Sequence, residues 1–238
     1  MSKLARIAPA ALAIWLAALS PALAQSRADH PVVVELYTSQ GCSSCPPADR
    51  ILAGLAGRDD VIALALHVDY WDYIGWADAF GDARFSERQR AYARAFGART
   101  VYTPQMIVGG SDHVMGVRPA ELESLIRQHG SDAAPVLLHL SRAGNVVAIS
   151  ARASRPLDEG AIVQLVRYSP HARVEISRGE NAGRTIDYSN IVTGWDAIGE
   201  WDGQGPLDMK VKAPGAEPVV VILQAPGPGE ILAAARLK

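Results

Sequence analysis

The chain has 238 residues, of which 49% are hydrophobic and 20% are charged, a composition that can form an ordinary packed core. Its formal net charge of −2 and the lack of a polybasic run give no support for nucleic-acid binding. The hydrophobic content also argues against a disordered acidic protein. We therefore expect one large domain or two small ones, and no nucleic-acid partner.

Residues 1–24 are typical of a secretory signal peptide. Two basic residues precede an apolar stretch over residues 7–19, and Ala22 and Ala24 are the small residues that a cleavage site requires. The apolar stretch is shorter than the roughly 20 residues of a membrane span, which disfavours the alternative of an N-terminal anchor. We therefore expect cleavage after Ala24, a periplasmic or secreted protein, and no stable membrane span after cleavage.

The first half of the remaining chain alternates between strand-like and helix-like segments. The expected elements are a strand at 32–37, a helix that starts at Pro46 and Pro47 and closes at Gly57, a strand at 61–68, a helix at 84–96, a hairpin of 105–108 and 111–115, and a helix at 119–128. A strand–helix–strand start predicts two parallel strands joined by a right-handed crossover. The order predicts an α/β domain over residues 25–132, with a mixed sheet and flanking helices.

The second half has a different sequence pattern, in which short apolar runs alternate with clusters of Gly, Pro, Asn and Asp. Expected strands lie at 136–141, 146–150, 161–168, 174–177, 185–193, 207–211 and 218–224. The sequence shows no convincing helical period in this half. Residues 133–238 are therefore predicted to form a second domain, a mostly antiparallel, β-sandwich-like unit.

Cys42 and Cys45 are the two cysteines of the chain, and they are spaced as C-x-x-C between a predicted strand and a predicted helix. At such a position free N–H groups and the positive end of the helix dipole stabilise a thiolate, the species that attacks disulfides. The alternatives are an inert disulfide and half of a zinc site. A disulfide that closes a loop of four residues stabilises the folded state by only about 2 kcal/mol, against about 3 kcal/mol for a loop of fifteen residues. No second C-x-x-C is present to complete a zinc site.

Thr103 and Pro104 precede the predicted hairpin, and together with the C-x-x-C pair they make the sequence resemble the thioredoxin superfamily over roughly residues 31–130. In that superfamily a cis-proline at this place packs beside the cysteines, and the backbone of the preceding residue pairs with substrate. The resemblance therefore implies a thioredoxin-like fold for the first domain. It also implies a cis bond between Thr103 and Pro104, with both residues in substrate binding.

Two features depart from the thioredoxin pattern, because Gly41 stands where a tryptophan precedes the first cysteine and two prolines follow Cys45. The runs ELYTSQGCSSCPPAD at 35–49 and RGENAGRT at 178–185 resemble a family of uncharacterised secreted proteobacterial proteins with a thioredoxin-like domain. That family brings no established reaction with it. The run at 178–185 is either a binding loop or a turn with a salt bridge, and we favour the turn because it holds no recognisable catalytic set.

An aromatic segment over residues 67–76 follows the second predicted strand, at the sheet edge where the cysteines are expected and where ligand sites collect. Trp71 or Trp76 in this segment could cover the disulfide in place of the missing tryptophan. The alternative is that these aromatic rings fill the core. We include Trp71 among the candidate substrate-binding residues.

His67, Met106, His113 and Met115 could join the cysteines in a copper site, as in copper chaperones with a thioredoxin fold. Those chaperones usually have three residues between their cysteines, whereas this chain has two. Lone His and Met residues in strands more often serve packing. The copper site is therefore the weaker interpretation of these residues.

These observations favour an exported thiol–disulfide oxidoreductase that acts on a protein or a small thiol or disulfide substrate. Cys42 would exchange with the substrate, and Cys45 would resolve the mixed disulfide. Thr103, Pro104 and Trp71 would contact the substrate, and no cofactor is expected. Two alternatives stay open, a copper- or zinc-binding chaperone and a non-catalytic interaction protein with a structural disulfide.

Overall fold

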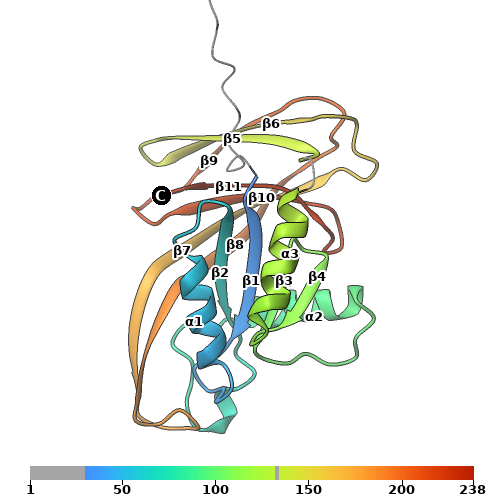
Figure 1. Ribbon diagram of the computed structural model, residues 1–238. Coiled ribbons are helices and arrows are strands. Elements are labelled where there is room, and N and C mark those ends of the chain that lie inside the picture. Colours follow the sequence, from blue (N-terminus) through green and yellow to red (C-terminus); the bar gives the residue numbers. More distant parts are fainter. Residues whose placement is uncertain (1–29, 132–133) are drawn as a thin grey trace, which may run out of the picture.

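The structure is a computed structural model that describes residues 30–131 and 134–238 (Figure 1). The signal peptide predicted at 1–24 and the domain boundary predicted between residues 132 and 133 lie outside the described residues. In chain order the elements are β1 (Val32–Thr38), α1 (Pro46–Leu55), β2 (Val61–His67), the 3-10 turn η2 (Asp72–Ile74), α2 (Ala83–Ala95), β3 (Gln105–Val108), β4 (Asp112–Met115), α3 (Pro119–Ser131), β5 (Val136–Ala143), β6 (Val146–Ala153), β7 (Ala161–Ile176), β8 (Arg184–Trp201), β9 (Leu207–Lys212), β10 (Val219–Gln224) and β11 (Ile231–Leu237).

Eight strands form one mixed sheet in the order β11-β10-β7-β8-β2-β1-β3-β4. β1 and β2 run parallel from the pair Val32–Val61 to the pair Thr38–His67, with α1 between them in the chain. β3 is antiparallel to β1, and β4 is antiparallel to β3. The parallel pair predicted from the sequence therefore lies near the middle of the sheet.

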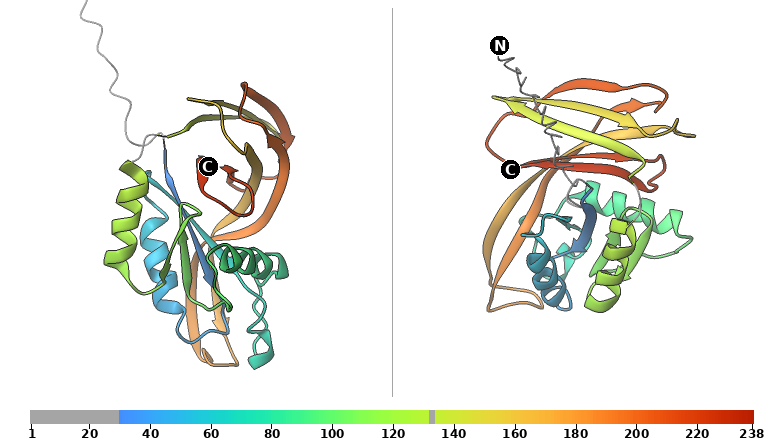
Figure 2. Two further views of the ribbon diagram at one scale, coloured as in Figure 1. Left: turned by 90° about the vertical axis from the view of Figure 1, so that its right-hand side faces the viewer. Right: turned by 45° about the horizontal axis from the view of Figure 1, so that its top comes forward.

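Helices cover both faces of β1 and β2, in which every residue is buried. α1 and α3 pack on one face through Leu52, Leu122 and Ile126, and α2 packs on the other through Phe85 and Tyr92. Figure 2 shows the two groups of helices on opposite sides of the sheet. Burial on both faces explains why these strands are almost continuously apolar. Within the described residues, no helix is both long enough and apolar enough to cross a membrane.

Four strands of the second half extend the same sheet. β8 runs parallel to β2 at the pair Ala65–Ile191, and β7, β10 and β11 follow with antiparallel pairing. The other sheet, β5-β6-β9, encloses a third apolar core with these strands and lies at the top of Figure 1. The division into two domains stays a prediction, and strands from both predicted domains take part in the eight-stranded sheet.

β7 and β8 are longer than the strands expected from the sequence, and their outer parts form a two-stranded ribbon. β10 pairs with β7 only as far as Arg167, and β2 pairs with β8 only at Ile191. Pro170 lies in the part of β7 that β10 does not reach, where a proline removes no hydrogen bond to a further strand. The strand therefore continues through Pro170, although the sequence predicts two separate strands there. The sequence also gives no expectation of β11.

A buried ion pair connects α2 to both halves of the sheet. Arg88 donates two hydrogen bonds of 2.8 Å to the carboxylate of Glu35 on β1, and its guanidinium carbon lies 3.9 Å from the ring centroid of Trp195 on β8. Arg88 also donates to the side chains of Gln164 on β7 and Gln224 on β10, at 3.4 and 3.0 Å. Strands from both halves of the chain are thereby fixed to one helix.

Candidate functional site

The two cysteines lie in the turn between β1 and α1, residues 39–45, which we call the disulfide turn. They are joined by a disulfide with an S–S distance of 2.16 Å and a Cα–Cα distance of 5.4 Å. Cys45 is the N-cap of α1, and its carbonyl oxygen accepts hydrogen bonds from the backbone N–H groups of Ala48 and Asp49 at 2.8 and 3.1 Å. The C-x-x-C pair therefore stands between the C-terminal end of a parallel strand and the start of a helix.

Both cysteine side chains are covered. Cys42 is 2% exposed and Cys45 is 0% exposed, whereas Ser43 and Ser44 between them are exposed. The sequence predicts that Cys42 is the more accessible cysteine, and in the disulfide form the two exposed fractions differ by only 2%. Access to the sulfur atoms therefore depends on the segments that pack around the disulfide turn.

The start of α1 provides few hydrogen-bond donors for a thiolate. Prolines occupy its first two positions and have no N–H, and the next two N–H groups are bonded to the Cys45 carbonyl oxygen. The remaining support for a Cys42 thiolate comes from the positive end of the helix dipole and from Ser44, whose Oγ lies 3.4 Å from Cys42 Sγ. The helix start therefore stabilises this thiolate less than one without prolines would.

The Thr103–Pro104 peptide bond is cis, as the thioredoxin resemblance implies. Pro104 approaches α1 across Gly116, since a Cβ on Gly116 would lie 2.8 Å from the Pro104 Cβ and 3.0 Å from the Ala48 Cβ. A residue with a side chain would not fit there, and the Gly116 N–H donates to the Pro104 carbonyl oxygen at 3.2 Å. Pro104 therefore lies beside the helical turn that follows Cys45.

The aromatic segment packs against the disulfide turn. A Cβ on Gly41 would lie 3.3 Å from the Trp71 Cβ, and the Trp71 indole N–H donates to the Thr103 hydroxyl at 2.7 Å. The Trp76 indole N–H donates to Oε1 of Gln40 at 2.8 Å. The structure thus brings Trp71 and Thr103 together beside the cysteines, while their roles in substrate binding stay predictions.

The turn of the β7–β8 hairpin, residues 177–183, also contacts the disulfide turn. Asn181 is 0% exposed, and its Nδ2 donates to the carbonyl oxygens of Gln40 and Cys42, both at 2.9 Å. Glu180 accepts a hydrogen bond from the backbone N–H of Ser43 at 3.3 Å. Sequence reasoning noticed this polar run but missed its partners, which lie 141 and 139 positions from Asn181 in the chain.

An open groove of about 670 Å³ runs beside the disulfide turn, between the start of α1 and β8. Its lining begins at Ser43 of the disulfide turn. Arg50 and Arg184 contribute cationic side chains from α1 and β8, and Asp187 on β8 contributes a carboxylate. Ile186 adds an apolar contact on β8. The groove therefore offers room and charge to a ligand next to Cys42.

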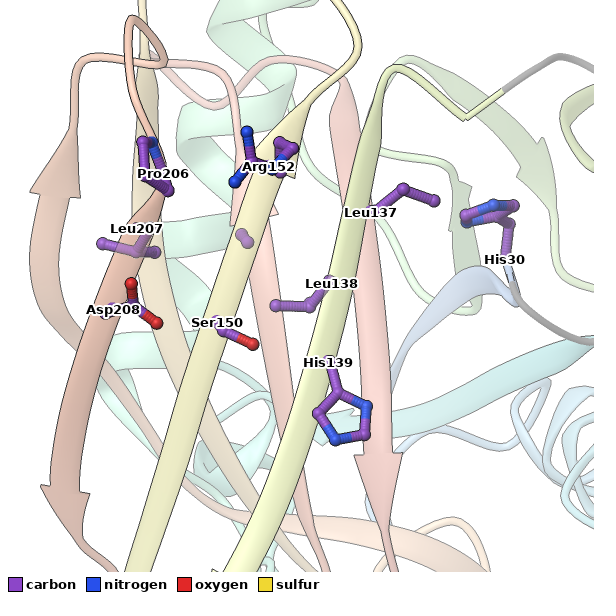
Figure 3. Close-up of a pocket in the computed structure, with 10 residues that line it drawn as sticks. His30, Leu137, Leu138, His139, Ser150, Arg152, Pro206, Leu207 and Asp208 are labelled. Carbon is purple, nitrogen blue, oxygen red and sulfur yellow. The ribbon is translucent and has the colours of Figure 1, made fainter.

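A second hollow, of about 400 Å³, lies on the three-stranded sheet (Figure 3). His139, Arg152 and Asp208 line it from three different strands, and all three are exposed. The cysteines, Thr103, Pro104 and Trp71 are not part of its lining. Figure 1 places these strands at the opposite end of the molecule from the start of α1, so this hollow is separate from the disulfide site.

Asp49 is a buried carboxyl group on α1, one helical turn after Cys45. Its Oδ1 accepts a hydrogen bond from the Thr38 hydroxyl at 2.8 Å, and its Oδ2 has no hydrogen-bond partner. Burial raises the pKa of Asp49 from 3.8 to about 7; the charge of Asp78 adds to this rise, whereas His67 and the Thr38 hydrogen bond oppose it. A carboxyl group with this pKa takes up or releases a proton near neutral pH.

Asp49 belongs to a buried polar cluster that adjoins the disulfide turn. Nδ1 of His67 lies 2.7 Å from Oδ2 of Asp78, which also accepts from the backbone N–H of Gln40 at 2.7 Å. The rings of His67 and Tyr188 have centroids 5.0 Å apart, and burial raises the pKa of Tyr188. Within the described residues, four of the five buried side-chain polar atoms that lack a hydrogen-bond partner belong to this cluster: Gln40 Nε2, Asp49 Oδ2, His67 Nε2 and Tyr188 OH.

The four residues considered as copper ligands are not brought together. Met106 lies in the core on the α1 side of the sheet, whereas the His113 ring packs on Phe96 with centroids 4.8 Å apart. His67 is fully buried in the polar cluster, and Met115 is 49% exposed. Over residues 30–131 and 134–238, no group of three or more His, Cys, Asp or Glu side chains is arranged to hold a metal ion.

A family model described as a protein of unknown function, DUF1223, matches residues 33–224, which include the disulfide turn, the aromatic segment and the hairpin turn. The chain belongs to the DUF1223 family. Protein AGR_C_4864 from Agrobacterium tumefaciens has a similar solved structure, with 34% sequence identity and a TM-score of 0.75. The match covers 87% of the DUF1223 chain and 93% of that chain.

HBP35 of Porphyromonas gingivalis also has a solved structure similar to the DUF1223 chain. The TM-score is 0.64 at 14% sequence identity, and the match covers 88% of this chain and 75% of that chain. At this identity the similarity concerns the fold alone. No curated protein matches the DUF1223 chain significantly.

Replacing Asp49 by Asn is expected to stabilise the folded DUF1223 protein at about pH 8 but not at about pH 4. Folding raises the pKa of this carboxyl group from 3.8 to about 7. As the pH rises between these values, the unfolded chain releases a proton that the folded chain keeps, so the free energy of unfolding falls. At about 1.4 kcal/mol per pKa unit, the penalty that Asn removes above pH 7 is at most about 4 kcal/mol.

Thermal unfolding of Asp49→Asn and of the wild type at both pH values measures this effect. The groups whose charges act on Asp49, namely His67, Asp78 and Arg50, remain in the variant. Asp208→Asn, which removes an exposed carboxyl group on β9, is the control and should show no comparable pH dependence. The same change in melting temperature at both pH values would contradict a raised pKa for Asp49.

Reduction of the disulfide is expected to increase tryptophan fluorescence, because a disulfide quenches nearby indole rings and two indoles pack on the disulfide turn. Trp71→Phe should lose most of the increase, and Trp76→Phe should lose part of it. Trp201→Phe is the control, because this ring lies in the third core. If both Trp71→Phe and Trp76→Phe keep the full increase, neither indole covers the sulfur atoms.

Proposed function

We propose that the protein is an exported thiol–disulfide oxidoreductase with a thioredoxin-like first domain, acting in the periplasm or outside the cell. The observation that carries this proposal is a C-x-x-C disulfide between a parallel strand and a helix start, in a chain with two cysteines. The cis bond before Pro104 supports it, as does the hydrogen bond from Trp71 to Thr103 beside the disulfide turn.

The reaction would proceed by two thiol–disulfide exchanges. The Cys42 thiolate attacks one sulfur of a substrate disulfide, forms a mixed disulfide and releases the other substrate sulfur as a thiolate. The Cys45 thiolate then attacks Cys42 Sγ, the Cys42–Cys45 bond forms, and the second substrate thiolate leaves. Two electrons pass to the substrate in this direction, and the reverse sequence oxidises a substrate dithiol.

The Cys45 thiol must lose a proton before it can resolve the mixed disulfide. Asp49 lies one turn further along α1, with an unpartnered Oδ2 and a pKa of about 7. A group with such a pKa can accept a proton at neutral pH and return it in the reverse direction. We assign Asp49 this role, with the His67–Asp78 pair beside it in the same buried cluster.

The substrate would be a protein or a small thiol or disulfide. Thr103, Pro104 and Trp71 are the proposed contacts for the residues around the substrate sulfur. The groove between α1 and β8 begins at Ser43, so it gives room for a longer segment of a protein substrate. Arg50 and Arg184 favour acidic groups in that segment, because the carboxylate of the lining, Asp187, is paired with Arg173.

A structural disulfide is the second candidate, and the near-complete burial of both cysteines favours it. The two candidates differ in how readily the bond is reduced. A structural disulfide in an exported protein typically has a reduction potential below about −300 mV, whereas a catalytic pair lies above this value. The reduction potential of the Cys42–Cys45 pair therefore separates them.

Equilibration of the purified protein, without residues 1–24, in glutathione redox buffers is expected to give a midpoint above about −300 mV. To measure the dithiol fraction, the exchange is quenched with an alkylating reagent and the mass of the intact protein is determined by mass spectrometry. A variant with Ser in place of both cysteines serves as the unlabelled reference. A midpoint well below this value would refute the oxidoreductase and support a structural disulfide.

A further inference from the structure

The hairpin turn contacts the disulfide turn mainly through one buried amide. Nδ2 of Asn181 donates to two carbonyl oxygens of the disulfide turn, and Oδ1 of Asn181 accepts from the Arg184 guanidinium at 2.9 Å. Three of the hydrogen-bonding positions of this amide are therefore occupied, and its orientation is fixed by Arg184. Directional hydrogen bonds from a buried amide fix the backbone conformation of the disulfide turn more closely than apolar packing would.

The hairpin turn also packs against the aromatic segment. Gly179 has a φ of 73°, which favours glycine, and a Cβ at this position would lie 3.1 Å from the Trp76 Cβ. Trp76 in turn donates its indole N–H to Gln40 of the disulfide turn. The hairpin turn, the aromatic segment and the disulfide turn are thus mutually packed.

We propose that Asn181 is a positioning residue for the disulfide exchange, which keeps Cys42 close to Cys45 after the disulfide opens. Asn181 acts through the backbone of Cys42, because its Nδ2 is bonded to the Cys42 carbonyl oxygen and not to a sulfur atom. This inference rests on the proposed function, since it assigns a second residue to the same site. It places a determinant of the redox equilibrium in the second half of the chain.

The effect arises in the dithiol form. In the disulfide form the S–S bond itself keeps the two cysteines together, so the contribution of Asn181 is small. In the dithiol form the conformation of the disulfide turn depends on its hydrogen bonds. Two of them meet at the Cys42 carbonyl oxygen, one from the Cys45 N–H at 3.2 Å and one from Nδ2 of Asn181 at 2.9 Å. An ordered turn keeps the two thiols close together, so the effective concentration of one thiol relative to the other is high, and this favours the disulfide. Loss of Asn181 therefore makes the disulfide easier to reduce.

The test compares Asn181→Ala with the wild type in the same glutathione buffers at one pH. The equilibrium constant for reduction is expected to rise about tenfold in the variant, which corresponds to about 30 mV. Thermal unfolding of the oxidised proteins shows whether the variant is folded. The wild-type midpoint tests the proposed function, and the ratio of variant to wild type tests the role of Asn181, so the two can fail separately.

Asn190→Gly is the matched control. Asn190 is a buried amide of the same hairpin, and its Nδ2 donates to the Ala63 carbonyl oxygen on β2 at 2.9 Å, away from the disulfide turn. Its φ is 50°, so glycine keeps the backbone conformation while removing the hydrogen bond. This variant is expected to lose stability and to keep the wild-type redox equilibrium.

Arg184→Met is a second variant, which removes the hydrogen bond that Arg184 donates to Asn181 Oδ1. Arg184 is exposed, so the substitution disturbs the packing little. It should shift the equilibrium in the same direction as Asn181→Ala, by a smaller factor, and it decides the question if Asn181→Ala does not fold. A wild-type equilibrium in folded Asn181→Ala would overturn the proposal. So would an equal shift in Asn190→Gly, because the effect would then follow from loss of stability alone.

Discussion

The buried guanidinium of Arg88 connects side chains from both halves of the chain. It is bonded to Glu35 on β1 and to side chains on β7 and β10, and it stacks on Trp195 of β8. Burial alone would lower the pKa of Arg88, but the charge of Glu35, its hydrogen bonds and the nearby Tyr92 and Tyr37 together outweigh burial, so the pKa is raised. Removing one partner of such a buried pair typically costs about 3–5 kcal/mol. The ion pair therefore stabilises the eight-stranded sheet where its two halves meet, together with the pairing of β8 with β2.

A continuous sheet has a direct consequence for the cysteines. Because β8 is placed beside β2, the ribbon that β7 and β8 form beyond the sheet runs along α1 and brings its turn to the disulfide turn. The disulfide turn is thus enclosed by three segments that are far apart in the sequence: its own strand–helix junction, the aromatic segment after β2, and the hairpin turn. This enclosure accounts for the low exposure of Cys42 and for the polar cluster in which Asp49 and Tyr188 meet.

The features that followed from the sequence are those with local causes. Apolar β-branched runs mark β1 and β2, and a proline pair marks the start of α1. Trp71 packs on Gly41, the residue before Cys42, because two parallel strands end at one sheet edge. The contacts of Asn181, the raised pKa of Asp49 and the pairing of β8 with β2 have no local signal. The contacts of Asn181 and the pairing of β8 depend on residues of the second half of the chain, whereas the pKa of Asp49 depends on its burial and on His67, Thr38 and Asp78, which only the tertiary fold brings to α1. The sequence likewise predicts two strands, 161–168 and 174–177, where β7 is continuous through Pro170, because a local pattern does not show which edge of a strand is unpaired.

Nucleophilic attack by Cys42 is tested most directly with the purified Cys45→Ser and Cys42→Ser proteins, each of which has one free thiol. Each protein is mixed with oxidised glutathione, and the mixed disulfide is followed by intact mass over a range of pH. The Cys42 thiol is expected to react faster than the Cys45 thiol, because Cys42 has the Ser44 hydroxyl and the helix dipole to stabilise its thiolate. Equal rates, or a faster reaction at Cys45, would contradict the assignment of Cys42 as the attacking residue.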